Sequence, residues 1–384
     1  MRLGYVYRDT AHQHSLDWWA KNGQDPNTTI YLIRSWAWSP WVQEAQQRLG
    51  HALHTQTTLD HRLKELAIVR VCTRNFSRYE LYHHIPAALA AGLTREEIAA
   101  IQSFGWSESA ALTAAQLACL QYVDEVDSGR GVQQETFDRL RAFLSEDQVV
   151  AITLQAGYWG CNARFTKALL VEDEPWMRER HTAARDHGFR DNEPMPELQA
   201  HPVPPRPAGS RIGLVSDEVA TPKSREWFDR WRQQDGGRLP NLVRAWAWSP
   251  HVQATEQRLW EALTGEHTAI PPRVRALVTR RVSVLNYSPY LLALLEPAQR
   301  AAGLDDAALA AVAGDWASSP ALNDEDRDLL RFVDAWDAGL GVTDTVFDAV
   351  KARCSRQVMV EIQLTAGFFG TQARFAKALD IALD

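Results

Sequence analysis

Apolar residues recur at spacings of three and four along most of the chain, and runs that alternate apolar and polar residues are scarce. The stretch from Leu63 to Val71 follows this spacing and predicts a mostly buried helix. Thr94, followed by two glutamates, is typical of a helix N-terminus. Further helices are predicted from Thr113 to Val126 and from Ser145 towards Leu170. The pattern therefore predicts an all-α fold.

The same landmarks occur twice in the chain. Residues 36–40, with the sequence WAWSP, return as residues 246–250, and the sequence ARF at residues 163–165 returns at residues 373–375. Matches of this kind extend from one end of each half to the other, so the repeated unit is a whole domain and not a short solenoid repeat. The sequence therefore predicts a tandem duplication.

The composition changes between the two copies. Residues 186–210 contain six prolines among polar residues, which is typical of an extended, semi-rigid linker. We therefore predict a first helical domain at residues 1–185, a proline-rich linker at residues 186–210 and a second, degenerate domain at residues 211–384. Each domain is long enough to bury its own core.

Composition and charge limit the classes of function. The formal net charge of −7 is mild for 384 residues, and the basic residues are scattered, so nucleic acid is not an expected partner. No apolar run approaches the roughly 20 residues that a membrane helix requires, and the amino terminus lacks a signal-peptide core, so we expect no membrane contact and a cytoplasmic location. The cysteines lie far apart, as expected of reduced, packed thiols: Cys72, Cys119, Cys161 and Cys354.

The two copies differ in their ionisable residues. The first copy carries Glu65, Glu80, His83 and His84 where the aligned residues of the second copy are Ala276, Leu291, Leu294 and Leu295. This replacement of acids and bases by apolar residues suggests one working domain and one scaffold domain. We expect the first copy to hold a pocket and the second copy to hold an apolar plug at the equivalent place.

Glu80 and His84 are four residues apart, so they share one face of a helix, and Glu65 precedes them on the helix before. A carboxylate beside an imidazole raises the pKa of the imidazole, and burial raises the pKa of a carboxyl group, so such a cluster can supply an acid and a base near neutral pH. The alternative is a weak surface pair, which the apolar neighbours disfavour. His61, one turn before Glu65, could join the pocket. We expect no metal, because His83 and His84 point about 100° apart on a helix.

The spacing resembles that of a known family. Alkylhydroperoxidase D-like proteins carry glutamate, two cysteines and histidine at the positions occupied here by Glu65, Ser77, Glu80 and His84. Both redox cysteines are absent. The run from Tyr79 to His84 is instead similar to the carboxymuconolactone decarboxylase branch of that superfamily, in which the second cysteine position is commonly glutamate. The resemblance implies two tandem alkylhydroperoxidase D-like helical domains, a closed homo-oligomer and no organic cofactor.

Together these observations predict a cofactor-independent lyase or isomerase that acts on a small oxo-acid or lactone-type substrate. In a decarboxylation, His84, oriented by Glu80, would protonate the carbon, and Glu65 would tune or relay the proton. The expected substrate-binding residues are His83, Arg70, Ser77 and Tyr82. Arg70 is matched by Arg281 in the second copy, so a structural salt bridge is its alternative role.

Other functions fit the same residues. A cyclase or dehydratase that acts on a biosynthetic intermediate would use the same acid and base. A non-catalytic binding or assembly protein would use the Glu–His cluster as a polar core network. A thiol peroxidase acting through Cys72 is the weakest of these alternatives, because that thiol lies in an apolar helix without a resolving cysteine nearby.

Overall fold

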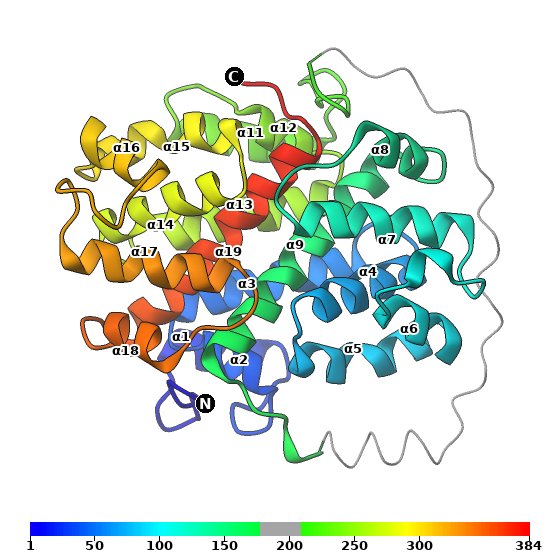
Figure 1. Cartoon of the computed structure of the whole chain (residues 1–384), viewed down its shortest axis with the longest axis horizontal. Coiled ribbons are helices and arrows are strands. Elements are labelled where there is room, and N and C mark those ends of the chain that lie inside the picture. Colours follow the sequence, from blue (N-terminus) through cyan, green and yellow to red (C-terminus); the bar gives the residue numbers. More distant parts are fainter. Residues whose placement is uncertain (177–208) are drawn as a thin grey trace.

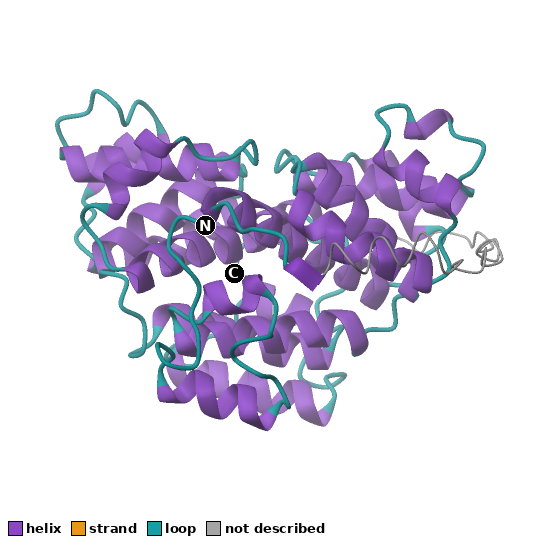
Figure 2. Ribbon diagram, turned by 90° about the horizontal axis from the view of Figure 1, so that it is seen from below, coloured by secondary structure: helices purple, strands orange, loops and turns teal. Residues whose placement is uncertain are grey.

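The computed structural model describes residues 1–176 and 209–384, and all regular secondary structure within these two ranges is helical. The predicted all-α fold class is therefore confirmed (Figure 2). Every helix in the described ranges is too short or too polar to cross a lipid bilayer. Most of the predicted linker, residues 186–208, and the predicted end of the first domain lie outside the described residues.

The first half of the chain, residues 1–176, holds nine described α-helices and one 3-10 turn (Figure 1). They are α1 (Gln13–Lys21), α2 (Tyr31–Trp36), α3 (Pro40–Thr55), α4 (His61–Arg74), α5 (Arg78–Ala90), α6 (Arg95–Gln102), η1 (Trp106–Glu108), α7 (Ala114–Asp127), α8 (Gln134–Arg141) and α9 (Glu146–Leu169).

The second half, residues 209–384, repeats this order. Its helices are α11 (Pro222–Gln234), α12 (Asn241–Trp246), α13 (Pro250–Thr264), α14 (Pro272–Leu285), α15 (Pro289–Ala301), α16 (Asp306–Ala313), α17 (Asp324–Asp337), α18 (Asp344–Lys351) and α19 (Arg356–Ala378). Equivalent helices have nearly equal lengths: α4 and α14 each have 14 residues, and α9 and α19 have 24 and 23. The repeated order supports the proposal of two tandem domains.

Helix boundaries follow local capping chemistry. The Thr94 hydroxyl accepts a hydrogen bond from the backbone N–H of Glu97 at 3.1 Å, and the Glu97 carboxylate accepts one from the backbone N–H of Thr94 at 2.6 Å. Thr113 forms the same kind of capping box at the start of α7, and Gly129, at a φ of 72°, follows the end of that helix. Each cap contributes about 1 kcal/mol, and the predicted starts are confirmed.

The two halves pack through their long last helices, α9 and α19, which cross the centre of the molecule (Figure 1). The crossing is close because glycines lie in the contact: a Cβ atom at Gly157 would clash with Thr371, and one at Gly367 would clash with Cys161. On either side of these two helices, α4 packs against α5 and α7, and α14 packs against α15 and α17. Helices α3 and α13 also pack against each other.

A buried charge network joins the halves at this crossing. Arg164 Nη2 lies 3.0 Å from Asp127 Oδ1, and Arg164 Nε donates to the backbone carbonyl of Asp337 at 3.0 Å. Burial opposes ionisation of Asp127, but Arg164, Arg374 and Arg74 together lower the pKa of this carboxyl group to about 2. Arg164 and its counterpart Arg374 therefore have a structural role, which their presence in both copies also indicates.

Candidate functional site

Helices α4 and α5 present the predicted acids and base. The turn between them passes through Phe76, whose φ is 51°, and Ser77, whose hydroxyl accepts from the backbone N–H of Glu80 at 3.4 Å and caps α5. Glu65 lies in the middle of α4 and is fully buried, while Glu80 and His84 lie one turn apart on α5. The turn folds α5 back against α4, so the three side chains point into the same space.

The structure brings Glu65, Glu80 and His84 together. His84 Nδ1 lies 3.0 Å from Glu65 Oε2, and His84 Nε2 lies 3.9 Å from Glu80 Oε2. A third helix, α9, adds Trp159, whose Nε1–H donates to His84 Nε2 at 2.7 Å. The imidazole is thus held from two sides, with Glu80 beside the nitrogen that Trp159 contacts.

This cluster borders a pocket of about 330 Å³ between α2, α3, α5 and α9. Its walls combine apolar and polar side chains from these helices: Ile30, Leu32, Ile33, Trp36, Gln47, Gly50, His51, Tyr79, Glu80, His83, His84, Tyr158, Trp159 and Asn162. Three buried polar atoms on these walls have neither a hydrogen-bond partner nor an ion-pair partner among the described residues, namely Glu80 Oε1, Asn162 Oδ1 and Trp36 Nε1. Because unmatched buried polar groups are uncommon, these atoms suit a polar ligand.

Burial and charge shift the protonation of the two pocket groups. Burial raises the pKa of Glu80 above its ordinary value, and the neighbouring His84 and His83 offset this only in part. For His84, burial lowers the pKa, but the hydrogen bond and charge of Glu65, with the charge of Glu80, raise it overall. Glu80 therefore keeps a proton to higher pH than an exposed glutamate.

The contact with Trp159 decides the tautomer of His84. An indole N–H can only donate, so His84 Nε2 must accept, and the imidazole proton lies on Nδ1, where it donates to Glu65. The charge of Glu65 favours protonation of His84, whereas the Trp159 hydrogen bond favours the neutral ring. His84 can therefore take up a proton at Nε2 only when Trp159 gives up this bond.

His83 takes a different position. Its Nε2 lies 3.3 Å from Glu174 Oε2, in a segment after α9, and Glu174 also accepts from the hydroxyl of Tyr79 at 2.6 Å. Burial acts to raise the pKa of Glu174, but hydrogen bonds from His83 and Tyr79 lower it. His83 lines the pocket, and its role in substrate binding stays a prediction. Glu174 was not predicted, although Asp384 accepts from the hydroxyl of Tyr290 in the same way in the second half.

The other three predicted substrate-binding residues lie away from the pocket walls. Arg70 forms a two-point ion pair with Asp124, with both N–O distances at 2.7 Å, and donates to the backbone carbonyl of Ile101. Arg281 and Asp334 form the same ion pair in the second half. The prediction that Arg70 holds a substrate carboxylate is therefore corrected: its guanidinium group is already occupied by a structural partner.

Ser77 and Tyr82 also have structural partners. The hydroxyl of Ser77 lies 3.2 Å from that of Thr166, in addition to its role as the cap of α5. The ring of Tyr82 lies 5.1 Å from the guanidinium carbon of Arg78, in a cation–π contact. Neither residue is among the pocket walls.

Sequence reasoning missed His54 and Trp159. His54, from α3, places its Nε2 3.6 Å from Glu65 Oε1, and burial lowers its pKa in spite of the Glu65 charge. The signal for Trp159 was present in the repeat, because the aligned residue of the second half is Phe369, which has no N–H to donate. His54 is likewise replaced, by Thr264.

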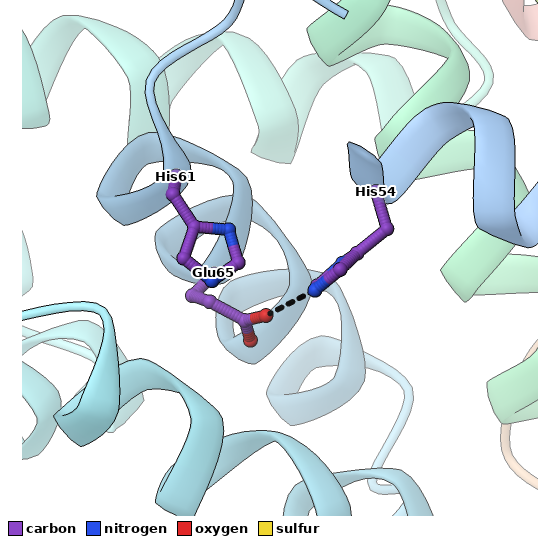
Figure 3. A group of neighbouring side chains, drawn as sticks. All are labelled: His54, His61 and Glu65. Atoms are coloured by element: carbon purple, nitrogen blue, oxygen red, sulfur yellow. Dashed lines mark ion pairs between the residues drawn. The ribbon is translucent and has the colours of Figure 1, made fainter. Parts of the chain in front are cut away.

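Glu65 also belongs to a second group of side chains, and this group could hold a metal ion. His54, His61 and Glu65 place one ligand atom each within 4.8 Å of one another (Figure 3). Two imidazoles and a carboxylate form a donor set that zinc and other transition metals accept. His61 is exposed, however, and the second oxygen of Glu65 already accepts from His84. The absence of a metal therefore stays a prediction to be tested.

Comparison with known proteins adds three findings. No curated protein sequence matches the chain. A crystal structure of an uncharacterized peroxidase-related protein from Silicibacter sp. TM1040 is similar to 46% of this chain and 93% of that chain, with 18% identity and a TM-score of 0.42. The family model for the carboxymuconolactone decarboxylase family matches residues 40–125, which include α4, α5 and all three clustered residues. This match confirms the predicted resemblance: over residues 40–125 the chain is recognised as similar to the carboxymuconolactone decarboxylase family.

Proposed function

We propose that the chain is an acid–base lyase or isomerase that acts on a small oxo-acid or lactone-type substrate in the pocket beside His84. The observation that carries this proposal is the buried pair of Glu80 and His84 at a pocket wall that also holds unmatched polar atoms. Their surroundings raise the pKa of both groups, and a carboxyl group and an imidazole held together in a pocket are usual partners in general acid–base catalysis.

The roles follow from the hydrogen bonds. Glu65 orients the imidazole of His84 through Nδ1, so Nε2 is the atom that exchanges a proton with the substrate. Glu80, with a raised pKa, carries a proton that can stabilise an oxyanion as it forms on a carbonyl oxygen. In a decarboxylation, His84 would first take up a proton from solvent at Nε2 once Trp159 has released this nitrogen. Carbon dioxide would then leave an enolate, and the enolate carbon would take that proton from His84 Nε2.

Trp159 would control when His84 Nε2 can exchange a proton with the substrate. While its N–H is bonded to His84 Nε2, that nitrogen has no free lone pair for the substrate. A bound substrate that accepts the indole N–H in place of His84 would expose Nε2 and align the reacting carbon in one step. Trp159 is therefore proposed as a positioning residue and not as a proton donor.

The alternative functions require different chemical groups in the protein. A cyclase or dehydratase needs the same acid and base, and the pocket does not select between these reactions. Hydroperoxide reduction needs a reactive thiolate, and burial raises the pKa of the nearest thiol, Cys72, well above its ordinary value, with further increases from Glu80 and Glu65. A binding protein would use the pocket without proton transfer.

Proton exchange at carbon tests the proposal whatever the final product is. The full chain is incubated in D₂O with a panel of small oxo-acids and lactones, and deuterium at the carbon next to the carbonyl is measured by NMR. We expect exchange or turnover that His84→Ala reduces by about 10²–10⁴-fold. His251→Ala, at an exposed histidine of the second half, is the control and should change nothing.

The outcomes separate the alternatives. Equal activity in the His84→Ala variant would remove His84 from the mechanism. Binding of panel members without exchange or turnover would favour the non-catalytic alternative.

A further inference from the structure

The second half has lost every ionisable group of the cluster. The residues aligned with His54, Glu65, His84 and Trp159 are Thr264, Ala276, Leu295 and Phe369. Ala276 and Leu295 are buried, with 4% and 7% of their surfaces exposed. Leu291, the third residue of the expected apolar plug, is also buried. The plug is nevertheless incomplete, because Ala276 is smaller than the aligned glutamate and a cavity remains beside it.

A cavity of about 250 Å³ takes the place of the cluster in the second half. Its walls come from α13, α14, α15 and α19: Trp260, Thr264, Pro272, Arg275, Ala276, Thr279, Leu295, Ala298, Gln299, Ala302 and Phe369. A larger cavity of about 630 Å³ shares Trp260, Thr264, Leu295 and Ala298 with it. An apolar cavity of about 150 Å³ already accommodates benzene, so the space suffices for a substituted aromatic ring.

One cation on this wall lacks a counterion. Arg275 is half-buried, and its one hydrogen bond among the described residues is from Nη1 to the backbone carbonyl of Leu263 at 3.4 Å. No carboxylate in the described ranges lies within ion-pair distance of its guanidinium group. Burial lowers the pKa of Arg275, and the charge of Glu361 opposes this change.

Glu361 is not a free counterion, because its carboxylate is already saturated. Oε1 accepts from the hydroxyl of Ser39 at 2.8 Å, and Oε2 accepts from the hydroxyl of Thr268 at 2.8 Å and from the backbone N–H of Ile270 at 2.8 Å. The arginines at the larger cavity have close partners as well: Arg230 pairs with Glu261, and Arg238 pairs with Asp235. Arg275 is thus the cation in these walls that remains available to an anion.

We propose that the second half binds a small aromatic monocarboxylate, with the ring in the apolar cavity and the carboxylate on Arg275. The apolar walls supply the affinity for the ring, and a guanidinium group in a partly desolvated place pairs strongly with a carboxylate. The equivalent residue of the first half, Lys64, also donates to a backbone carbonyl, that of His54 at 3.0 Å. This proposal does not rest on the proposed function of the first half.

Calorimetric titration of the full chain with 4-tert-butylbenzoate tests the proposal. We expect one binding event, and Arg275→Gln should weaken it by roughly 10- to 100-fold, which is the contribution of a hydrogen bond to a charged group. Arg238→Gln is the matched control, because it removes a cation that already has a partner, and it should leave the affinity unchanged. The uncharged 4-tert-butylbenzyl alcohol should bind as weakly to the wild type as the acid binds to Arg275→Gln.

Three outcomes would overturn the proposal: no binding by the wild type at millimolar concentrations, equal affinity in Arg275→Gln, or equal affinity for the alcohol. Folding of each variant is checked by circular dichroism. If Arg275→Gln does not fold, Ala276→Leu replaces it, because this change fills the cavity and keeps the charge. Ala276→Leu should abolish binding, and unchanged affinity in that variant would place the ligand elsewhere.

Discussion

Replacement of Glu80 by glutamine should make the protein more stable at alkaline pH. The side chain is buried, with 2% of its surface exposed, and its Oε1 atom has no hydrogen-bond partner among the described residues. Burial raises the pKa of this carboxyl group, so above that pKa the folded protein carries a charge that it accommodates poorly. Glutamine has nearly the same shape and no charge, so Glu80→Gln removes this penalty.

The expected gain in stability follows from the cost of burying Glu80 Oε1 without a hydrogen-bond partner. A buried polar group without a partner costs about 1–3 kcal/mol, and more when it is charged. His84, 3.9 Å from Glu80 Oε2, offsets part of this cost. We therefore expect Glu80→Gln to raise the free energy of unfolding by about 1–2 kcal/mol at pH 8.

The direction of the Glu80 pKa shift determines how the stability of the wild type changes with pH. A glutamate whose pKa is raised in the folded state loses a proton at lower pH when unfolded, so wild-type stability declines as the pH rises from the ordinary value of 4.5 through the raised pKa. Glu80→Gln lacks this decline, so the two proteins should have equal stability near pH 4 and diverge at higher pH. Urea unfolding followed by circular dichroism at several pH values measures the difference.

Glu65→Gln provides the matched control, because Glu65 Oε2 accepts a hydrogen bond from His84 Nδ1. Loss of this charge-assisted bond should lower the free energy of unfolding by about 1.5–3 kcal/mol, opposite in sign to Glu80→Gln. If Glu80→Gln is instead less stable than the wild type at pH 8, the carboxylate is a satisfied part of a core network. The acid role of Glu80 would then be refuted.

Four further predictions follow from the same contacts. Leu295→Ala, at the position aligned with His84, should lower stability by about 2 kcal/mol and spare any activity that His84→Ala abolishes, as unfolding and turnover assays would reveal. Asp127→Asn should cost about 2 kcal/mol at pH 7, because a pKa lowered from 3.8 to about 2 stabilises the folded state above pH 3.8 and is lost as the pH falls towards 2; a loss that is equally large at pH 2 would contradict this. Cys72→Ser should leave the native activity intact, and rapid Cys72-dependent consumption of an organic hydroperoxide would argue for a redox enzyme. Elemental analysis of the purified protein should find no stoichiometric metal; zinc or iron that disappears in a Glu65→Ala variant would show that the group in Figure 3 binds an ion.

Local information in the chain was sufficient for the helices and for the central pair of the candidate site. The three-four spacing and the capping residues Thr94 and Thr113 act within a few residues of themselves, so their helices could be predicted without tertiary contacts. The four-residue spacing of Glu80 and His84 places both on one helical face. Comparison of the two copies then indicated which half retains ionisable residues, because equivalent positions share one fold.

Only the tertiary structure determined which partner each polar side chain has. Arg70 was open in the sequence to a substrate-binding role, but packing of α7 against α4 gives it Asp124, 54 residues later, as its partner. Trp159 reaches His84 from a helix 75 residues away, and so it decides the tautomer that no local pattern specifies.

The contrast between plug and cavity has the same origin. The apolar residues Ala276 and Leu295 predicted a filled core. They also show that the second half lacks the ionisable side chains that the first half carries at these positions. The space that remains depends on how closely α13, α14, α15 and α19 approach one another around Ala276. Side-chain volume is encoded locally, whereas the space to be filled is set by the whole packing arrangement.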